Sequence, residues 1–246
     1  NTANATVHKL TIQYNMNGGG LASTHGSTVS DDGTYVLLNS SRTIHTINYG
    51  ESLPSGGLSD LNSASLINLQ KIGYHIDASA AFNTKADGTG DTFNQTTAYA
   101  ASDFDDISAG NKTIVLYANW KANTDTPYKV QHWQQKLTGS VTPQNDTNYT
   151  LTDTDNLTGT TAASVTPAVK TTYTGFTVPP TQTVTIAADG STILNYYYTR
   201  NSYDVTLNKG TGIDTVTGAG SYLYEAQVSI DATVKTGYTW NKWTGD

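Results

Sequence analysis

The chain has 246 residues, and 13 Lys and Arg against 20 Asp and Glu give it a net charge of -7. The few basic residues are scattered, which argues against binding to nucleic acid or to an anionic membrane surface. Cysteine is absent, so disulfides, thiolate catalysis and cysteine-ligated zinc are excluded. No apolar run reaches the ~18 residues of a membrane span, so we expect no membrane insertion.

Charged residues make up only 13% of the chain, about half the ~25% that is usual in soluble domains. Thr, Ser, Asn and Gly take their place, and hydrophobic residues reach only 36%. We therefore expect thin cores in which the 16 Tyr and 4 Trp supply much of the buried area.

The first predicted module covers residues 7–122, after a loose lead-in at 1–6. Leu10, Ile12 and Tyr14 alternate with polar residues, which predicts a half-buried strand that ends at the glycine turn 17–20. Further expected elements are strands at 34–39, 42–49 and 113–120, a short strand or extended turn at 72–76, a helix at 59–69 and a helical turn at 102–104. Ser59 is a suitable cap for the helix.

The second predicted module covers residues 123–200 and begins with a short polar linker that Pro127 stiffens. A strand is expected at 128–133. The prolines at 179 and 180 end any regular element there. The turn at 188–190 predicts a hairpin between 184–186 and 192–198.

The third predicted module covers residues 201–246 and follows the second without a spacer. Strands are expected at 204–207, 221–224 and 227–234. No closing strand comparable to 113–120 or 192–198 is found in it, so we interpret the chain as part of a longer protein.

A glycine followed by an aromatic residue recurs once in each module, at 73–74, 175–176 and 237–238. Recurrence of one phrase between strands indicates a tandem array. We expect each phrase to place its aromatic ring in a thin core after a turn that only glycine tolerates. The four tryptophans are likewise expected to be core anchors, namely Trp120, Trp133, Trp240 and Trp243.

Modules one and three resemble the Listeria–Bacteroides surface repeat, also called the internalin B-repeat. The residues that carry the resemblance are Asn17-Gly18-Gly19, Tyr49-Gly50, Gly73-Tyr74 and Leu116-Tyr117-Ala118-Asn119-Trp120, with Gly237-Tyr238 in the third module. Module two resembles mucin-binding-protein-type repeats through Tyr128–Trp133, Leu157-Thr158-Gly159, Gly175-Phe176 and Ala188–Tyr198. Both resemblances imply small β-grasp modules, and hence a β-rich α+β chain built as an elongated tandem array.

The polar residues give no catalytic or metal-binding pattern. The five histidines are isolated, so no metal site, cofactor or catalytic residue is predicted. Asp153-Thr154-Asp155-Asn156 lacks the spacing of a calcium loop and is expected to be a solvated loop. A Lys–Asn crosslink within strands, from Lys9, Lys112 or Lys129 to Asn119 or Asn195, is an open alternative.

The aromatic residues of the strand ends are the candidate ligand-facing or junction residues. Because side chains alternate along a strand, Tyr197 must point opposite to Tyr196 and Tyr198. One face is core, and the other is either a module junction or a platform for a sugar ring. Trp120 and Trp133 flank the first junction and complete the set.

The families imply a non-enzymatic, extracellular repeat region of a Gram-positive cell-surface adhesin, secreted and held to the cell wall through other parts of the protein. We expect a monomeric rod that acts as a stalk or spacer. The alternatives are a module that binds a host glycan or mucin glycoprotein and, ranked last, part of a cell-wall hydrolase.

Overall fold

The computed structural model describes residues 1–54 and 67–245, which form many short strands and little helix. This confirms the predicted β-rich class. The described chain divides into two compact units. The first comprises Asn1–Thr126, Thr158–Ala163 and Ile186–Ser191, and the second comprises Pro127–Leu157, Ser164–Thr185 and Thr192–Asp246. The module boundaries expected from the sequence stay predictions.

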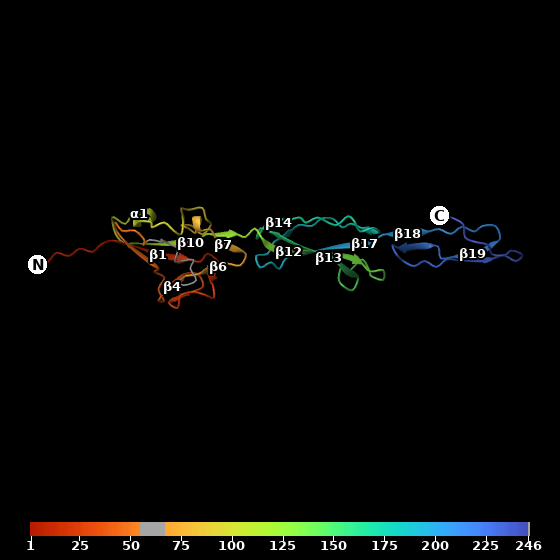
Figure 1. Ribbon diagram of the computed structural model, residues 1–246, viewed down its shortest axis with the longest axis horizontal. Helices are drawn as coiled ribbons and strands as arrows, with labels where there is room; N and C mark the ends of the chain where they lie inside the picture. Colours follow the sequence, from red (N-terminus) through yellow and green to blue (C-terminus); the bar gives the residue numbers. More distant parts are fainter. Residues whose placement is uncertain (55–66, 246) are drawn as a thin grey trace. The chain divides into compact units, whose positions relative to one another are not determined.

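The first unit is built on a five-stranded sheet with the order β5-β1-β10-β8-β9 (Figure 1). Its strands are β1 (Lys9–Asn15), β2 (Gly20–Leu21), β3 (Val29–Asp31), β4 (Val36–Leu38), β5 (His45–Asn48), β6 (Leu69–Gln70), β7 (Tyr74–Ile76), β8 (Phe82–Asn83), β9 (Thr92–Phe93), β10 (Lys112–Ala118) and β11 (Trp120–Ala122). A 3-10 helix η2 (Ala78–Ala80) and a single helical turn α1 (Ala101–Phe104) complete it. The opening strand β1 lies parallel to the closing strand β10 and antiparallel to β5.

The core of the first unit covers one face of this sheet. Leu10, Ile12 and Tyr14 of β1 are fully buried, as their alternation predicts. The Tyr14 ring meets the Phe82 ring edge to face at 5.2 Å. The Tyr14 hydroxyl is hydrogen-bonded to His45 Nδ1 at 2.8 Å, so this buried polar group keeps a partner.

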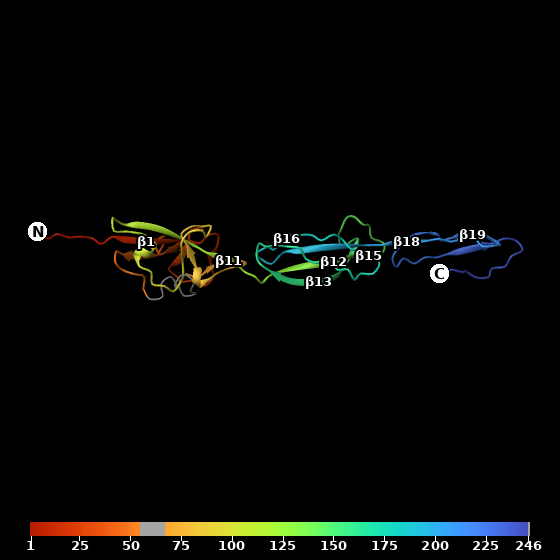
Figure 2. The same ribbon diagram turned by 90° about the horizontal axis from the view of Figure 1, so that it is seen from above.

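The second unit is built on a four-stranded sheet with the order β13-β12-β17-β15, in which β12 and β17 are parallel (Figure 2). Its strands are β12 (Thr126–Gln135, whose first residue belongs to the first unit), β13 (Tyr149–Gly159, whose last two residues also do), β14 (Ser164–Val165), β15 (Phe176–Thr177), β16 (Val184–Thr185), β17 (Ile193–Arg200), β18 (Ser202–Val205), β19 (Ile213–Thr217), β20 (Gly220–Leu223) and β21 (Asp231–Val234). An opening strand parallel to a closing strand therefore occurs in both units.

The core of the second unit is made of few aliphatic and many ring side chains. Val130, His132, Tyr196 and Tyr198 are at most 1% exposed. The predicted alternation of the tyrosines is confirmed, because Tyr197 lies on the opposite face and is only half-buried. A core of tyrosine and histidine needs hydrogen-bond partners for its polar atoms, and this requirement shapes the candidate site.

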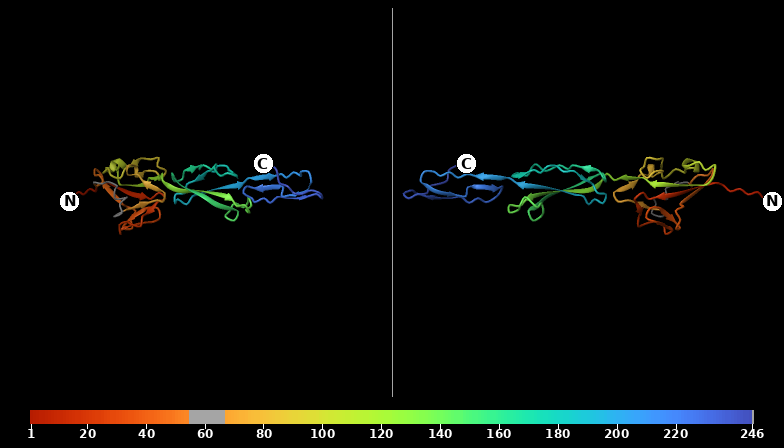
Figure 3. Two further views of the ribbon diagram at one scale, coloured as in Figure 1. Left: turned by 45° about the vertical axis from the view of Figure 1, so that its right-hand side comes forward. Right: turned by 180° about the vertical axis from the view of Figure 1, so that it is seen from behind.

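The residues after Asn201 form two separate two-stranded ribbons, β18–β20 and β19–β21, drawn in blue in Figure 3. The sequence predicted β18, β20 and β21 with shifted ends and missed β19. Trp240 is 43% exposed and Trp243 37% exposed, so their prediction as core anchors is wrong. No side chain of the buried hydrophobic core lies after Tyr198 in the part of the chain that the structure describes.

Three further predictions need correction. The expected helix 59–69 lies largely outside the described residues, but Leu69 at its end belongs to strand β6. The expected hairpin 184–198 does not form, because β16 pairs with β14 and β17 pairs with β12 and β15. The Asp153 to Asn156 segment is part of strand β13 rather than a loop.

Candidate functional site

The three Gly–aromatic phrases share one backbone turn. Each glycine has a positive φ, at 77° for Gly73, 78° for Gly175 and 86° for Gly237. The aromatic N–H donates to the carbonyl three residues earlier in each turn: Tyr74 to Lys71 at 3.0 Å, Phe176 to Tyr173 at 3.3 Å and Tyr238 to Lys235 at 3.1 Å. The aromatic rings are half-buried in the first two turns and 52% exposed at Tyr238, so the prediction that they anchor the cores is wrong.

The first turn holds three separate stretches of the first unit together. The carbonyl of Gly73 accepts from the Asn123 N–H at 2.9 Å and from the Thr161 hydroxyl at 2.8 Å. The Asn123 carbonyl in turn accepts from the Thr161 N–H at 2.9 Å. A Cβ atom at Gly73 would lie 2.6 Å from the Ala188 carbonyl oxygen, so only glycine fits there.

The second turn repeats this arrangement inside the second unit. The Gly175 carbonyl accepts from the Asn201 N–H at 2.9 Å, and the Asn201 carbonyl accepts from the Tyr224 N–H at 2.8 Å. A Cβ atom at Gly175 would lie 2.2 Å from the Tyr224 ring. We call the Gly73–Asn123–Thr161 and Gly175–Asn201–Tyr224 sets the coupling turns.

Arg200 reinforces the second coupling turn. Its Nε donates to the Gln135 carbonyl and its Nη1 to the Tyr224 carbonyl, both at 2.8 Å. The guanidinium also lies 4.9 Å from the centroid of the Phe176 ring, within cation–π distance. The side chain is only 13% exposed, so these contacts are largely shielded from water.

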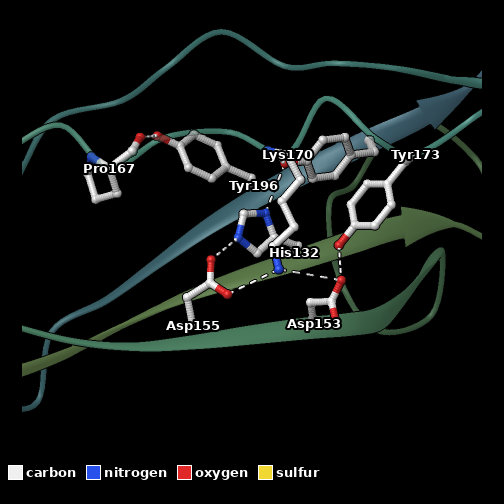
Figure 4. Close-up of polar contacts among 8 residues, drawn as sticks. His132, Asp153, Asp155, Pro167, Lys170, Tyr173 and Tyr196 are labelled. Carbon is white, nitrogen blue, oxygen red and sulfur yellow. Dashed lines mark hydrogen bonds and ion pairs between the residues drawn. The ribbon is translucent and has the colours of Figure 1, made fainter.

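The second unit also contains a polar network around the fully buried His132 (Figure 4). His132 Nε2 lies 3.0 Å from Asp155 Oδ2, and Nδ1 lies 2.9 Å from the Tyr198 hydroxyl. The Tyr198 oxygen accepts from the Lys170 N–H at 2.8 Å. A neutral imidazole that donates from Nε2 and accepts at Nδ1 satisfies every one of these groups.

The Lys170 ammonium closes the network on its outer side. Its Nζ lies 3.1 Å from Asp155 and 3.6 Å from Asp153, and the Tyr173 hydroxyl donates to Asp153. Burial opposes ionisation of Asp155, but hydrogen bonds from Lys170 and His132 outweigh it and lower the pKa of that carboxyl. An ionised Asp155 paired with a lysine is poorly suited to act as a general acid.

The candidate aromatics separate into inward and outward groups. Tyr196 and Tyr198 are fully buried, and the Tyr196 hydroxyl donates to the Pro167 carbonyl at 2.7 Å. Trp133 and Tyr197 stack on the opposite face, with ring centroids 6.0 Å apart. The Trp133 indole N–H donates to Asn195 Oδ1 at 3.0 Å, so an amide lies beside the two half-buried rings.

Trp120 has a structural position in the first unit. Its indole N–H donates to the Met16 carbonyl at 2.8 Å. Its ring covers Gly19, where a Cβ atom would come within 2.3 Å of it. This position of the Trp120 ring explains why a glycine occupies position 19.

Several of the crosslink candidates have other polar partners. Lys112 forms an ion pair with Asp105 at 2.8 Å. Asn119 donates its side-chain amide to the Ala80 carbonyl, and Asn195 accepts from Trp133. Neither asparagine has a lysine among its hydrogen-bond partners in the described chain.

Sequence reasoning missed the two coupling asparagines, Arg200 and the His132 network. A signal for the asparagines exists, since Trp120 precedes Asn123 and Tyr198 precedes Asn201 by the same three residues. Asp153 and Asp155 are two residues apart, and this spacing places both on one face once their segment is a strand. The histidine itself carries no local signal, because its partners lie 23 and 66 positions away.

Burial raises the pKa of five tyrosines, namely Tyr14, Tyr149, Tyr173, Tyr197 and Tyr198. A raised folded-state pKa gives stability that is complete below the unfolded value of about 10 and is lost as the pH rises through the folded value. We therefore expect the melting temperature to fall steeply above about pH 10, together with the appearance of tyrosinate absorbance. A gradual tyrosinate titration near pH 10 with a constant melting temperature would contradict this.

Among residues 1–54 and 67–245, no group of three or more His, Asp or Glu side chains is arranged to hold a metal ion. Over the same ranges, no helix has the length and hydropathy that a membrane span needs. Comparison with known proteins finds no matching family model, no matching curated protein and no matching solved structure.

Proposed function

We propose that this chain is a non-enzymatic spacer region of a Gram-positive cell-surface adhesin, built from tandem β-grasp-like modules. The observation that carries the proposal is the repeated coupling turn. Gly73 with Asn123 and Gly175 with Asn201 use the same hydrogen bonds to fasten the residue after a strand, β11 or β17, to a following stretch of chain. A device used twice to fix successive segments supports a mechanical role.

The chemistry of the polar residues also supports a structural role. The His132 network is satisfied internally, and its carboxylates are engaged by Lys170. Most remaining ion pairs are on the surface, where they contribute little to stability or to reactivity. Low charge and many hydroxyl and amide side chains keep such a spacer hydrated without attracting polyanions.

Small-angle X-ray scattering of the 246-residue chain tests the proposal that it is a spacer built from tandem modules. A compact chain of this length has a radius of gyration of about 18 Å, whereas a tandem array must exceed this clearly. We expect a value well above that figure, independent of protein concentration, as a monomeric array requires. A radius of gyration near about 18 Å would contradict the proposal.

The second candidate function is recognition of a host glycan by the outward face of the second unit. It is favoured by the Trp133–Tyr197 stack and the adjacent Asn195, because aromatic rings and amides are the groups that hold sugar rings. Binding on a glycan array that is abolished by Trp133→Ala but kept in Trp240→Ala would favour this function over a passive spacer.

A further inference from the structure

The chain enters and leaves each main sheet through two neighbouring parallel strands. In the first unit β1 pairs with β10 over residues 10–15 and 112–117, and in the second unit β12 pairs with β17 over residues 129–134 and 193–198. Because the paired strands are parallel, the start of the first strand and the end of the second lie at opposite ends of the ladder. Tension along the chain therefore acts to slide the two strands past each other, and it loads all the hydrogen bonds of the ladder at once.

Both parallel pairs lie in the interior of their sheets. β1 and β10 are flanked by β5 and β8, and β12 and β17 are flanked by β13 and β15. The inward side chains of the pairs are buried, as Ile12 and Leu116 show in the first unit and Val130 and Tyr196 in the second. A strand of either pair therefore cannot leave its sheet without breaking a second ladder and exposing core side chains to water.

Side chains fasten both ends of the β1–β10 ladder. At the end where the chain enters β1, the Lys9 N–H donates to Asn111 Oδ1 at 2.8 Å. At the end where the chain leaves β10, the Trp120 indole N–H donates to the Met16 carbonyl at 2.8 Å. The two ends of a ladder that is loaded by sliding carry the largest strain, because force enters each strand there. Hydrogen bonds at these ends therefore oppose the start of sliding.

The β12–β17 ladder is fastened in a similar way. At the end where the chain enters β12, the Lys129 N–H donates to the Thr192 carbonyl at 3.0 Å. At the end where the chain leaves β17, Arg200 Nε donates to the Gln135 carbonyl at 2.8 Å, and the Arg200 N–H donates to Gln135 Oε1 at 2.9 Å. Gln135 is only 3% exposed, so water competes little for the bonds at this end.

The two-stranded ribbon β18–β20 is loaded differently. Its strands are antiparallel, with Ser202 opposite Leu223 and Val205 opposite Gly220. The chain enters β18 at Ser202 and leaves β20 at Leu223, and these two residues lie at the same end of the ribbon. Tension along the chain therefore separates the pairs of this ribbon one after another, and each step breaks only the bonds of one pair.

We propose that the β1–β10 and β12–β17 pairs bear tension that is transmitted along the chain. Each pair resists sliding as a whole, whereas the β18–β20 ribbon opens at low force. The inference deepens the proposed spacer function and rests on it for its biological role, because a spacer between a cell surface and a bound partner is under tension. Scattering measures the dimensions of the chain and pulling measures its resistance to force, so the two proposals can fail separately.

The test is single-molecule pulling of the 246-residue chain through pairs of introduced cysteines, because the chain contains no cysteine of its own. Asp125→Cys with Ser202→Cys applies force at opposite ends of the β12–β17 ladder, so the strands slide. Asp125→Cys with Ile193→Cys applies force to both strands at the same end, so the ladder is peeled open pair by pair. All three side chains are exposed, so the handles can be attached to the folded chain.

Both handle pairs should release a similar length of chain, about 240 Å, when the ladder breaks. The rupture force should be at least about twofold higher in the sliding geometry than in the peeling geometry, because the hydrogen bonds break together rather than in turn. Equal rupture forces in the two geometries would overturn the proposal.

A variant of Arg200 tests the fastened end of this ladder. Arg200→Met removes the side-chain bond to the Gln135 carbonyl and should lower the sliding force roughly 1.5-fold. It should leave the peeling force unchanged, because peeling begins at the other end. The matched control is Lys136→Met, since Lys136 Nζ donates to the Asp146 carbonyl within the β12–β13 connection and does not cross the ladder. A sliding force that Arg200→Met leaves unchanged, or an equal loss of force in both geometries, would also overturn the proposal.

Discussion

Replacing His132 with alanine is expected to lower the unfolding free energy of the second unit by about 3–5 kcal/mol. The imidazole is fully buried, so its removal leaves a cavity against Tyr196, whose ring stacks on it at 5.8 Å. It also leaves the buried Tyr198 hydroxyl without its acceptor. Since domains are usually stable by only roughly 5–15 kcal/mol, urea unfolding followed at the amides of β12 and β17 should show a much lower midpoint.

A double-mutant cycle separates the packing of His132 from its hydrogen bonds. His132→Phe keeps a ring in place but leaves the Tyr198 O–H unpaired, which costs about 1–3 kcal/mol. Adding Tyr198→Phe removes that orphaned hydroxyl, and the half-exposed Lys170 N–H can then bond to water. The double variant should therefore be destabilised by less than the sum of the two single variants.

The matched control is His25→Phe, because His25 is exposed and its Nδ1 is hydrogen-bonded to the carbonyl of the adjacent Gly26. Its effect should stay within about 0.5 kcal/mol. Strict additivity in the His132 and Tyr198 cycle would show that the 2.9 Å contact between them contributes nothing to folding.

The inward faces of the main strands could be predicted from the sequence. Leu10, Ile12 and Tyr14 are buried, and Tyr197 points away from its two neighbours, because side chains alternate along any strand. This rule is local and depends on no partner. It therefore holds without knowledge of the sheet.

The pairing of the strands could not be predicted in the same way. The turn at Asp189-Gly190 suggested a hairpin, and that turn does form, with the Ser191 N–H donating to Asp189 at 3.0 Å. However, β17, which begins at Ile193, pairs with β12, which begins at Thr126, and β16 pairs with β14. Which strand fills an edge depends on the apolar area that the whole sheet buries, and no local signal contains that information.

For the Gly–aromatic phrase, the backbone turn could be predicted from the sequence, but its role in packing could not. Its recurrence and its positive φ were predictable, because a left-handed turn favours glycine wherever it occurs. Its role in packing was not predictable from the sequence. The atoms that crowd Gly73 and Gly175 belong to Ala188 and Tyr224, which are remote in sequence. The glycines are required for close approach of another segment as much as for the turn itself.

That requirement gives the second prediction. Gly175→Ala is expected to detach the stretch that begins at β18 while leaving the β12–β17 pair folded. The new Cβ atom would lie 2.2 Å from the base of the Tyr224 ring, which cannot move away without breaking the 2.8 Å bond between Tyr224 and Asn201. Hydrogen exchange at the Tyr224 amide should accelerate at least tenfold, which corresponds to about 1.4 kcal/mol.

Two comparisons separate this clash from backbone strain. Gly237→Ala imposes the same left-handed strain at a φ of 86°, but its Cβ atom meets nothing within 4 Å. That variant should lose only about 1–2 kcal/mol of stability, which is the usual cost of an alanine in the left-handed conformation. The effect should stay within its own turn. In a Tyr224→Ala background the ring is gone, so Gly175→Ala should become as mild as Gly237→Ala. If Gly175→Ala and Gly237→Ala are equally mild in the unmodified background, the second coupling turn does not fasten β18, and the mechanical role loses its main support.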